Sequence, residues 1–257
     1  MTTPMTMTSE NGAPVFWLTP EWPLPPGVGA CQTTRLGGVS LPPYQSLNLG
    51  LHVQDEPQAV AENRRRLAAC LPAPPLWLNQ VHGTRVVAAT PATPDGTEGD
   101  GVVARAPGRV CAIMTADCLP VLFCARDGSA VGAAHAGWRG LAGGVLEATV
   151  AAMGVAPDQL SCWLGPAIGP RAFEVGDEVR AAFLDQDGAQ ASAFQPGAAP
   201  GKWLADIYAL ARRRLNRLGL SQIYGGGFCT VAEGERFFSY RRDKVTGRMA
   251  SLIWLTA

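Results

Sequence analysis

Short runs of apolar residues, separated by glycine, proline and small polar residues, recur along most of the 257-residue chain. Apolar runs of this length, bounded by turn residues, are typical of buried strands. The runs predict strands at 85–89, 110–116, 119–124, 130–134, 161–164, 222–230 and 249–255.

A second pattern, with apolar residues three and four positions apart, predicts helices at 59–71, 140–153, 175–184 and 204–218. Mixed strands and helices indicate an α/β or α+β fold. Segments 33–40 and 186–201 have the composition of loops. No linker divides the chain, so we expect a single domain over 15–257, preceded by a disordered tail at 1–14 that is rich in Thr, Ser, Pro and Gly.

Composition narrows the class of protein. Hydrophobic residues make up 47% of the chain and charged residues 16%, which is enough apolar material for a substantial core. Lys plus Arg and Asp plus Glu balance at 21 each, so no nucleic-acid partner is predicted. No apolar run is long enough to span a bilayer and no signal peptide is visible, so no membrane association is expected. Nothing in the sequence implies a protein partner.

The seven cysteines are odd in number and include no CxxC pair. This pattern predicts reduced, mostly buried thiols and a cytoplasmic protein, since a disulfide framework needs pairs.

Three reactive side chains follow the ends of predicted strands. They are His82, Cys118 and His135, each with a small residue or proline nearby. Imidazole and thiolate are ligands that zinc prefers, and three protein ligands leave a fourth position open for water. The spacing is long and matches no local zinc motif, so residue types alone favour the other interpretation, in which Cys118 is a buried thiol and the histidines are turn residues. Cys229 or His52 could serve as a fourth ligand.

Several motifs surround these residues in order. They are NQVHG at 79–83, DGV at 100–102, TADCLP at 115–120, HAGWRG at 135–140, LGPAIGP at 164–170 and FFSYRRD at 237–243. On these motifs the chain resembles the YfiH/YlmD-type family, also called the laccase-domain or polyphenol oxidase family, from about Thr33 to Leu255.

The resemblance implies a single-domain α/β fold with a layered, mixed β-sheet core flanked by helices. It implies a zinc site on His82, Cys118 and His135, with copper as a possible substitute. It also implies a purine nucleoside phosphorylase that acts on adenosine, inosine, guanosine and methylthioadenosine, with adenosine deamination as a second activity.

Three other functions can be compared on the residues, of which a copper-dependent phenol oxidase fits least. A multicopper oxidase needs more imidazoles than the three histidines of this chain can supply. A cysteine hydrolase or amidase acting on a peptidoglycan precursor would use Cys118 as the nucleophile and His135 as the base. A non-enzymatic binding module is the third alternative.

Further residues are candidates for catalysis and for binding nucleoside and phosphate. Asp117 is the first candidate for proton transfer, with the capping of a turn as the alternative. Arg35, beside the glycine-rich segment 37–40, is the first candidate for a catalytic contact with phosphate, and Arg139 is the second. Ser46 and Asn48 are expected to line the same pocket.

The remaining basic and aromatic candidates rank lower. Arg241, Arg242 and Arg248 fit the solvated edge of a C-terminal strand, and His52 fits a packing role. Phe237, Phe238 and Tyr240 could stack on a purine, although at least one of them is expected in the core.

Overall fold

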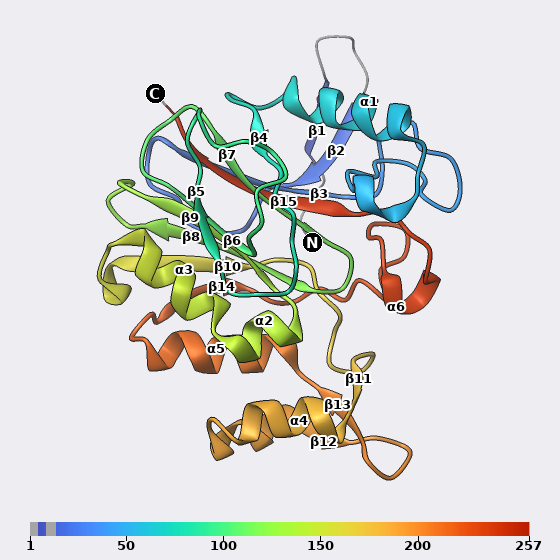
Figure 1. The fold of residues 1–257 in the computed structure, drawn as a ribbon, viewed down its shortest axis with the longest axis vertical. Coiled ribbons are helices and arrows are strands. Elements are labelled where there is room, and N and C mark those ends of the chain that lie inside the picture. The colour runs from blue at the N-terminus through green and yellow to red at the C-terminus, as the bar shows by residue number, and fades with distance from the viewer. Residues whose placement is uncertain (1–4, 9–13, 257) are drawn as a thin grey trace.

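Two six-stranded sheets pack face to face with helices on their outer faces, as Figure 1 shows for the computed structural model of the protein. The structure describes residues 5–8 and 14–256. Helix α1 (Pro57–Ala68) covers the first sheet, and α2 (Trp138–Gly143), α3 (Val145–Met153) and α5 (Ile207–Arg217) cover the second. The predicted layered α/β fold with a mixed sheet core is therefore confirmed.

The first sheet is antiparallel except at one edge. Its order is β1 (Met5–Thr8), β2 (Pro14–Leu18), β3 (Val28–Thr33), β15 (Met249–Leu255), β7 (Val110–Thr115) and β4 (Pro75–Leu76). The parallel pair is β4 with β7. The C-terminal strand thus lies in the middle of this sheet, between β3 and β7.

The second sheet carries the cluster described below. Its order is β14 (Gln222–Gly225), β10 (Leu160–Leu164), β8 (Leu119–Ala125), β9 (Val131–Ala136), β6 (Gly101–Ala104) and β5 (Val86–Ala88). A small third sheet contains β11 (Glu174–Gly176), β13 (Lys202–Ala205) and β12 (Phe194–Pro196). It lies beside α4 (Asp177–Leu184), at the bottom of the view in Figure 1.

Four short helices complete the described chain. They are the 3-10 helices η1 (Leu51–Val53), η2 (Pro157–Gln159) and η3 (Gly188–Ala193), and the helix α6 (Tyr240–Asp243).

Strand β8 shows how the sequence pattern builds the layers. Leu119, Val121 and Phe123 point to the helices, whereas Leu122 and Cys124 point to the first sheet. Successive side chains of a strand alternate between faces, and here both faces are covered. A continuous apolar run is therefore what this strand requires.

Several predicted elements differ from the structure at glycines. The helix predicted over 140–153 is two helices, because Gly144 has a φ of 100° that ends α2 before α3 begins. The strand predicted over 222–230 ends at Gly225, since Gly225 and Gly226 both have positive φ. Positive φ is easy for glycine and interrupts either regular structure.

Two predicted irregular segments contain structure. The loop predicted over 186–201 includes η3 and β12. The tail predicted over 1–14 includes β1, which pairs with β2, while 1–4 and 9–13 lie outside the described residues.

No helix in the described part of the chain is both long and apolar enough to cross a membrane. The seven cysteines are all free thiols.

Candidate metal centre

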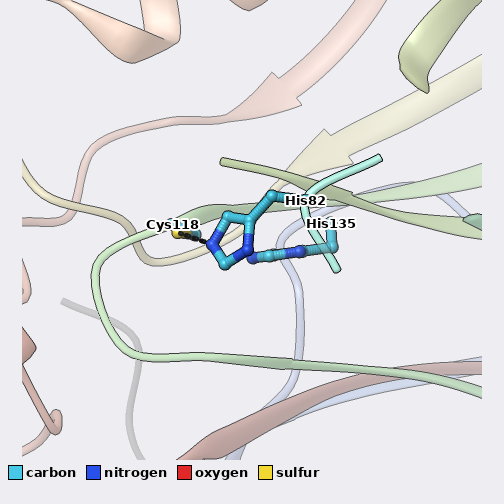
Figure 2. Close-up of side chains that lie close together, drawn as sticks. All are labelled: His82, Cys118 and His135. Atoms are coloured by element: carbon cyan, nitrogen blue, oxygen red, sulfur yellow. Dashed lines mark hydrogen bonds between the residues drawn. The ribbon is translucent and has the colours of Figure 1, made fainter. Parts of the chain in front are cut away.

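His82, Cys118 and His135 converge at one end of the second sheet (Figure 2). Their ligand atoms all lie within 4.8 Å of one another, and Cys118 Sγ is 3.9 Å from His82 Nε2. The two imidazole rings have centroids 4.7 Å apart. The three predicted ligands are therefore brought together by the fold.

The register of β8 and β9 explains part of this convergence. His135 lies opposite Pro120, so Cys118, just before β8, reaches the same end of the sheet. His135 shares a face of β9 with Val131 and Ala133, which pack between the two sheets. The imidazole therefore points into the space between the sheets, where the strands end.

Asp100 holds both histidines in place. It is fully buried, and its carboxylate accepts a bond from His135 Nδ1 at 2.8 Å. It also accepts the backbone N–H groups of Val81, His82 and Gly83 at 3.1, 2.9 and 2.7 Å. Since Nδ1 of His135 is engaged, Nε2 is left to face the cluster. Burial alone would raise the pKa of Asp100, but the bonds from His135 and the backbone lower it.

Two non-glycine residues at the cluster have left-handed backbone. His82 has a φ of 61° and Asp117 a φ of 90°. Such a conformation costs on the order of 1–3 kcal/mol and persists where the surroundings fix it. At His82 the bonds of the Asp100 carboxylate to residues 81–83 fix this turn.

Within the cluster, the Cys118 thiol is close to its metal-binding form, whereas His135 would release a proton when a metal binds. Burial raises the pKa of the Cys118 thiol, but the charge of His135 and hydrogen bonds from His135 and His82 outweigh burial and lower this pKa to about 6. Burial lowers the pKa of His135, and the Cys118 thiolate and Asp100 raise it above its usual value. Cysteine binds metals as the thiolate, so Cys118 is close to its ligand form at neutral pH.

Gly137 leaves the space that these side chains share. A Cβ at this position would lie 3.0 Å from Cys118 Sγ, 3.0 Å from His82 Cδ2 and 3.6 Å from His135 Nε2. The donor set, two nitrogens and one sulfur, is one that zinc and copper both accept. The residues therefore fit a metal ion with three protein ligands.

Replacing Gly137 by Ala is expected to weaken metal binding about 10-fold or more while the protein stays folded. The added methyl group would touch two ligands, and shifts of a few tenths of an ångström change metal–ligand distances. Competition for zinc with a chelator, together with circular dichroism, measures both effects. Unchanged zinc affinity would contradict this view of the cluster. Gly227→Ala is the control, because a Cβ at Gly227 meets no atom within 4 Å, and this variant should keep its zinc affinity. Gly96 also has open space, but its positive φ would strain an alanine.

A cavity of about 400 Å³ opens beside the cluster, between the ends of the two sheets. It is lined by the three cluster residues and by His52, Leu78, Asn79, Gln80, Met114, Thr115, Ala116, Tyr240 and Arg248. Gln80 fixes its wall, since its side chain makes two 2.8 Å bonds with the backbone of Met114. The volume suits a small-molecule substrate.

A second cavity of about 250 Å³ also reaches Cys118 and His82. Trp138, Phe173 and Arg139 line it, and the guanidinium of Arg139 stacks over Trp138 at 4.5 Å. The predicted residue Arg139 therefore lies near the cluster, in this second cavity.

Arg35 and Ser46 line neither of these cavities. They lie in a separate cavity of about 230 Å³ with Gln45 and Gly234. The guanidinium of Arg35 donates to the carbonyl oxygens of Gln45 at 3.1 Å and Gly234 at 2.9 Å. The Ser46 hydroxyl accepts the N–H of Gly38.

Asn48 is fully buried, and its side chain forms hydrogen bonds within the loop before α1 instead of facing a cavity. Its Oδ1 accepts the N–H groups of Gly50 at 3.0 Å and Arg248 at 2.8 Å. Its Nδ2 donates to Asp55 at 2.9 Å. Asn48 thus ties the loop before α1 to the start of β15.

The Asp117 carboxylate has two partners at 2.6 Å, the hydroxyl of Thr230 and the backbone N–H of Arg241. These bonds hold α6, and with it Tyr240, over the two cavities. The geometry favours a structural role for this carboxylate.

The remaining candidates divide between core and cavity. Phe237 and Phe238 are fully buried, so they pack in the core, whereas Tyr240 lines both cavities beside the cluster. Arg241 and Arg242 donate to backbone carbonyls instead of lying at a solvated edge. His52 and Arg248, both ranked low from the sequence, line the larger cavity.

Fold and cluster together define a layered α/β protein with a three-residue metal-ligand set at a cavity. A family model described as "multi-copper polyphenol oxidoreductase laccase" matches residues 29–256. The chain belongs to this family, which is the YfiH/YlmD family of the resemblance.

Relatives and solved structures agree with this assignment. A protein of Pseudomonas aeruginosa named a purine nucleoside phosphorylase is 59% identical, over 93% of this chain and 98% of that protein. YfiH of Escherichia coli, with the same enzyme name, is 58% identical over the same shares. The crystal structure of a Neisseria meningitidis protein has a TM-score of 0.92 at 54% identity, covering 94% of this chain and 99% of that one. YlmD of Geobacillus stearothermophilus has a TM-score of 0.88 at 33% identity, covering 99% and 100%.

Proposed function

We propose that the protein is a cytoplasmic, zinc-dependent purine nucleoside phosphorylase that also deaminates adenosine, with residues 15–257 as one catalytic domain. The observation that carries the proposal is the convergence of the ligand atoms of His82, Cys118 and His135 beside a cavity of about 400 Å³. The purine nucleoside phosphorylase names of the close relatives support the reaction. The substrates that we propose are adenosine, inosine, guanosine and methylthioadenosine.

In this proposal, His82, Cys118 and His135 hold the ion. When bound, zinc would supply Lewis acidity to the cavity beside these three residues. Asp100 orients His135 and fixes the turn at His82, so the ligands are held in place before the ion binds.

Phosphorolysis breaks the bond between C1′ of the ribose and the purine nitrogen, and it forms a bond from C1′ to a phosphate oxygen. The site therefore has to hold an anion and a purine next to each other. The cavity contains cationic and aromatic side chains for both tasks, in Arg248 and Tyr240. Both sheets contribute to its wall, through Met114 of the first and His135 of the second, which supports one catalytic unit.

The test combines metal analysis with an assay. Protein purified without added metal is expected to contain about one zinc ion per chain. With adenosine and phosphate it should release adenine and ribose 1-phosphate, and with adenosine alone it should release inosine. A metal-free preparation with undiminished activity would contradict the zinc proposal. Zinc-loaded protein that leaves every one of the four nucleosides intact would contradict the phosphorylase proposal.

One feature favours a second candidate, a cysteine hydrolase acting on a peptidoglycan precursor. Asp100, His135 and Cys118 form a chain of orienting acid, imidazole and acidic thiol, which is also the arrangement of a nucleophile activated by a base. The position of His82 beside the same thiol favours the metal, because a nucleophile–base pair does not need a second imidazole.

A further inference from the structure

The cavity beside the metal centre is basic. Among the residues that line it, all of them in the described part of the chain, none is Asp or Glu, whereas Arg248 and His52 both contribute. The Cys118 thiolate is the one anionic group among these lining residues, and a bound metal ion would neutralise it, so the charge left on the wall would be positive and would attract anions. The ligand expected here is therefore an anion, and it would lie next to the three metal ligands.

Arg248 is held in this wall by its backbone and half of its guanidinium. Its N–H donates to Asn48 Oδ1 at 2.8 Å, and Nη1 donates to the carbonyls of Thr246 and Gly247, both at 3.0 Å. Nε and Nη2 donate to no acceptor among the described residues, which leaves one side of the guanidinium for a ligand. Burial lowers the pKa of Arg248, but an arginine stays charged at neutral pH.

Arg248 forms no ion pair with the residues that the structure describes, and the negative charges of Cys118 and Asp117 act on its guanidinium without a direct contact. A half-buried guanidinium that has no counter-ion in contact with it is stabilised when an anion binds beside it. Arginine often binds phosphate through two N–H groups at once, and such charge-assisted hydrogen bonds are about twice as strong as those between neutral groups.

Gly50 brings His52 against Arg248. A Cβ at Gly50 would lie 2.8 Å from Cγ of Arg248 and 3.3 Å from Cε1 of His52, so only glycine allows this packing. Burial, and then the charge of Arg248, lower the pKa of His52. The ring is therefore neutral at pH 7 and offers one N–H donor to the cavity.

Thr115 adds an unsatisfied group to the same wall. It is 1% exposed, and its hydroxyl has no hydrogen-bond partner in the described structure. A buried hydroxyl without a partner costs free energy, so a ligand that bonds to it gains affinity. Thr115 ends β7 and Arg248 precedes β15, and these strands are neighbours in the first sheet.

We propose that Arg248, together with the Thr115 hydroxyl and His52, binds the inorganic phosphate that attacks the nucleoside. This subsite rests on the proposed phosphorolysis. It replaces Arg35 as the phosphate ligand, because two nitrogens of Arg35 are engaged by carbonyl groups in a different cavity. The attacking anion then lies beside the metal, and the purine lies toward Tyr240.

Arg248→Met tests the subsite in zinc-loaded protein. The KM for phosphate should rise about 10- to 100-fold, as expected for the loss of a charge-assisted contact, while the KM for adenosine stays within about 3-fold. Zinc content should stay unchanged. Arg126→Met is the control, since Arg126 is exposed at the far end of β8. Thr115→Val keeps the shape of the side chain and should raise the KM for phosphate by about 2- to 10-fold.

Direct binding of inorganic phosphate separates this proposal from the proposed function. Calorimetry on wild-type and Arg248→Met protein, both loaded with zinc, should show binding that depends on Arg248. If the wild type cleaves nucleosides and neither the Arg248 nor the Thr115 variant changes the KM for phosphate, the subsite is wrong and the function stands. If the wild type cleaves nothing but binds phosphate through Arg248, the function is wrong and the subsite stands. Wild-type protein that binds no phosphate overturns the subsite.

Discussion

Cys118→Ser is expected to remove zinc and phosphorolysis together. A hydroxyl group keeps its proton at neutral pH and is a poor zinc ligand, whereas the Cys118 thiol has a pKa lowered to about 6. Loss of a partner that only orients a ligand costs about 10- to 100-fold in metal affinity or activity, so loss of a ligand should cost at least about 100-fold. Plasma mass spectrometry measures the zinc, and release of adenine measures the activity.

The same variant separates the metal enzyme from the cysteine hydrolase. If Cys118→Ser abolishes activity while the zinc content stays at the wild-type level, Cys118 is a nucleophile and its role as a metal ligand is contradicted. Cys70→Ser is the matched control, because Cys70 lies just after α1 and lines none of the cavities described above. It should keep both zinc and activity.

The hydrophobic pattern predicted β7 and β15 of the first sheet and β8, β9 and β10 of the second, but it did not predict the interior strands β3 and β6. Met249–Leu255 has the predicted bounds, and β7 and β8 differ from prediction by one residue at one end. These strands are buried on both faces, so their sequences are continuous apolar runs. Short edge elements such as β4 carry too few residues for a local pattern, and they form because a neighbouring strand already exists.

The metal ligands could be predicted because each lies in a recognisable motif at a strand end. The partners of those ligands could not be assigned. Asp100 bonds to His135 across 35 positions, and nothing local to the DGV motif reveals that contact. The only signal was an acidic residue in a motif between the segments of His82 and His135.

The choice among arginines shows the same limit. Arg35 was favoured for its glycine-rich neighbours, but its side-chain acceptor Gly234 is 199 positions away in the chain. Arg248 was ranked low as a strand-edge residue, yet Asn48, 200 positions away, fixes its backbone at the cavity. The direction of a long side chain depends on such acceptors, and these come from the tertiary structure.

The laccase name of the family and the donor set of this chain call for different chemistry. Blue and trinuclear copper sites are built mostly from imidazole, and the chain has three histidines. Two of these lie in the cluster and the third, His52, packs against Arg248. One metal ion at one site is what these residues can hold.

Asp100→Ala is expected to lower the free energy of unfolding by about 3–5 kcal/mol, the range for removing one member of a buried charged pair. The carboxylate is fully buried and accepts hydrogen bonds from His135 and from three backbone N–H groups. Alanine therefore leaves four donors without their acceptor. Chemical denaturation of zinc-free protein measures the loss without the added stability that a bound ion gives. Asp127→Asn, in an exposed turn, is the control and should change stability little.

Asp100→Asn separates the two tasks of this carboxylate. The amide oxygen can still accept the N–H groups of Val81 and Gly83, while the amide nitrogen takes the place of the oxygen that bonds to His82 and His135, so the loss of stability should be smaller than for alanine. The amide lacks the charge that orients His135, so zinc affinity should fall about 10- to 100-fold. A chelator titration gives this affinity. The pairing of β9 with β6 holds the backbone of His135 whether residue 100 is Asp or Asn. If the Asn variant binds zinc as tightly as the wild type, this pairing, and not the Asp100 carboxylate, positions His135.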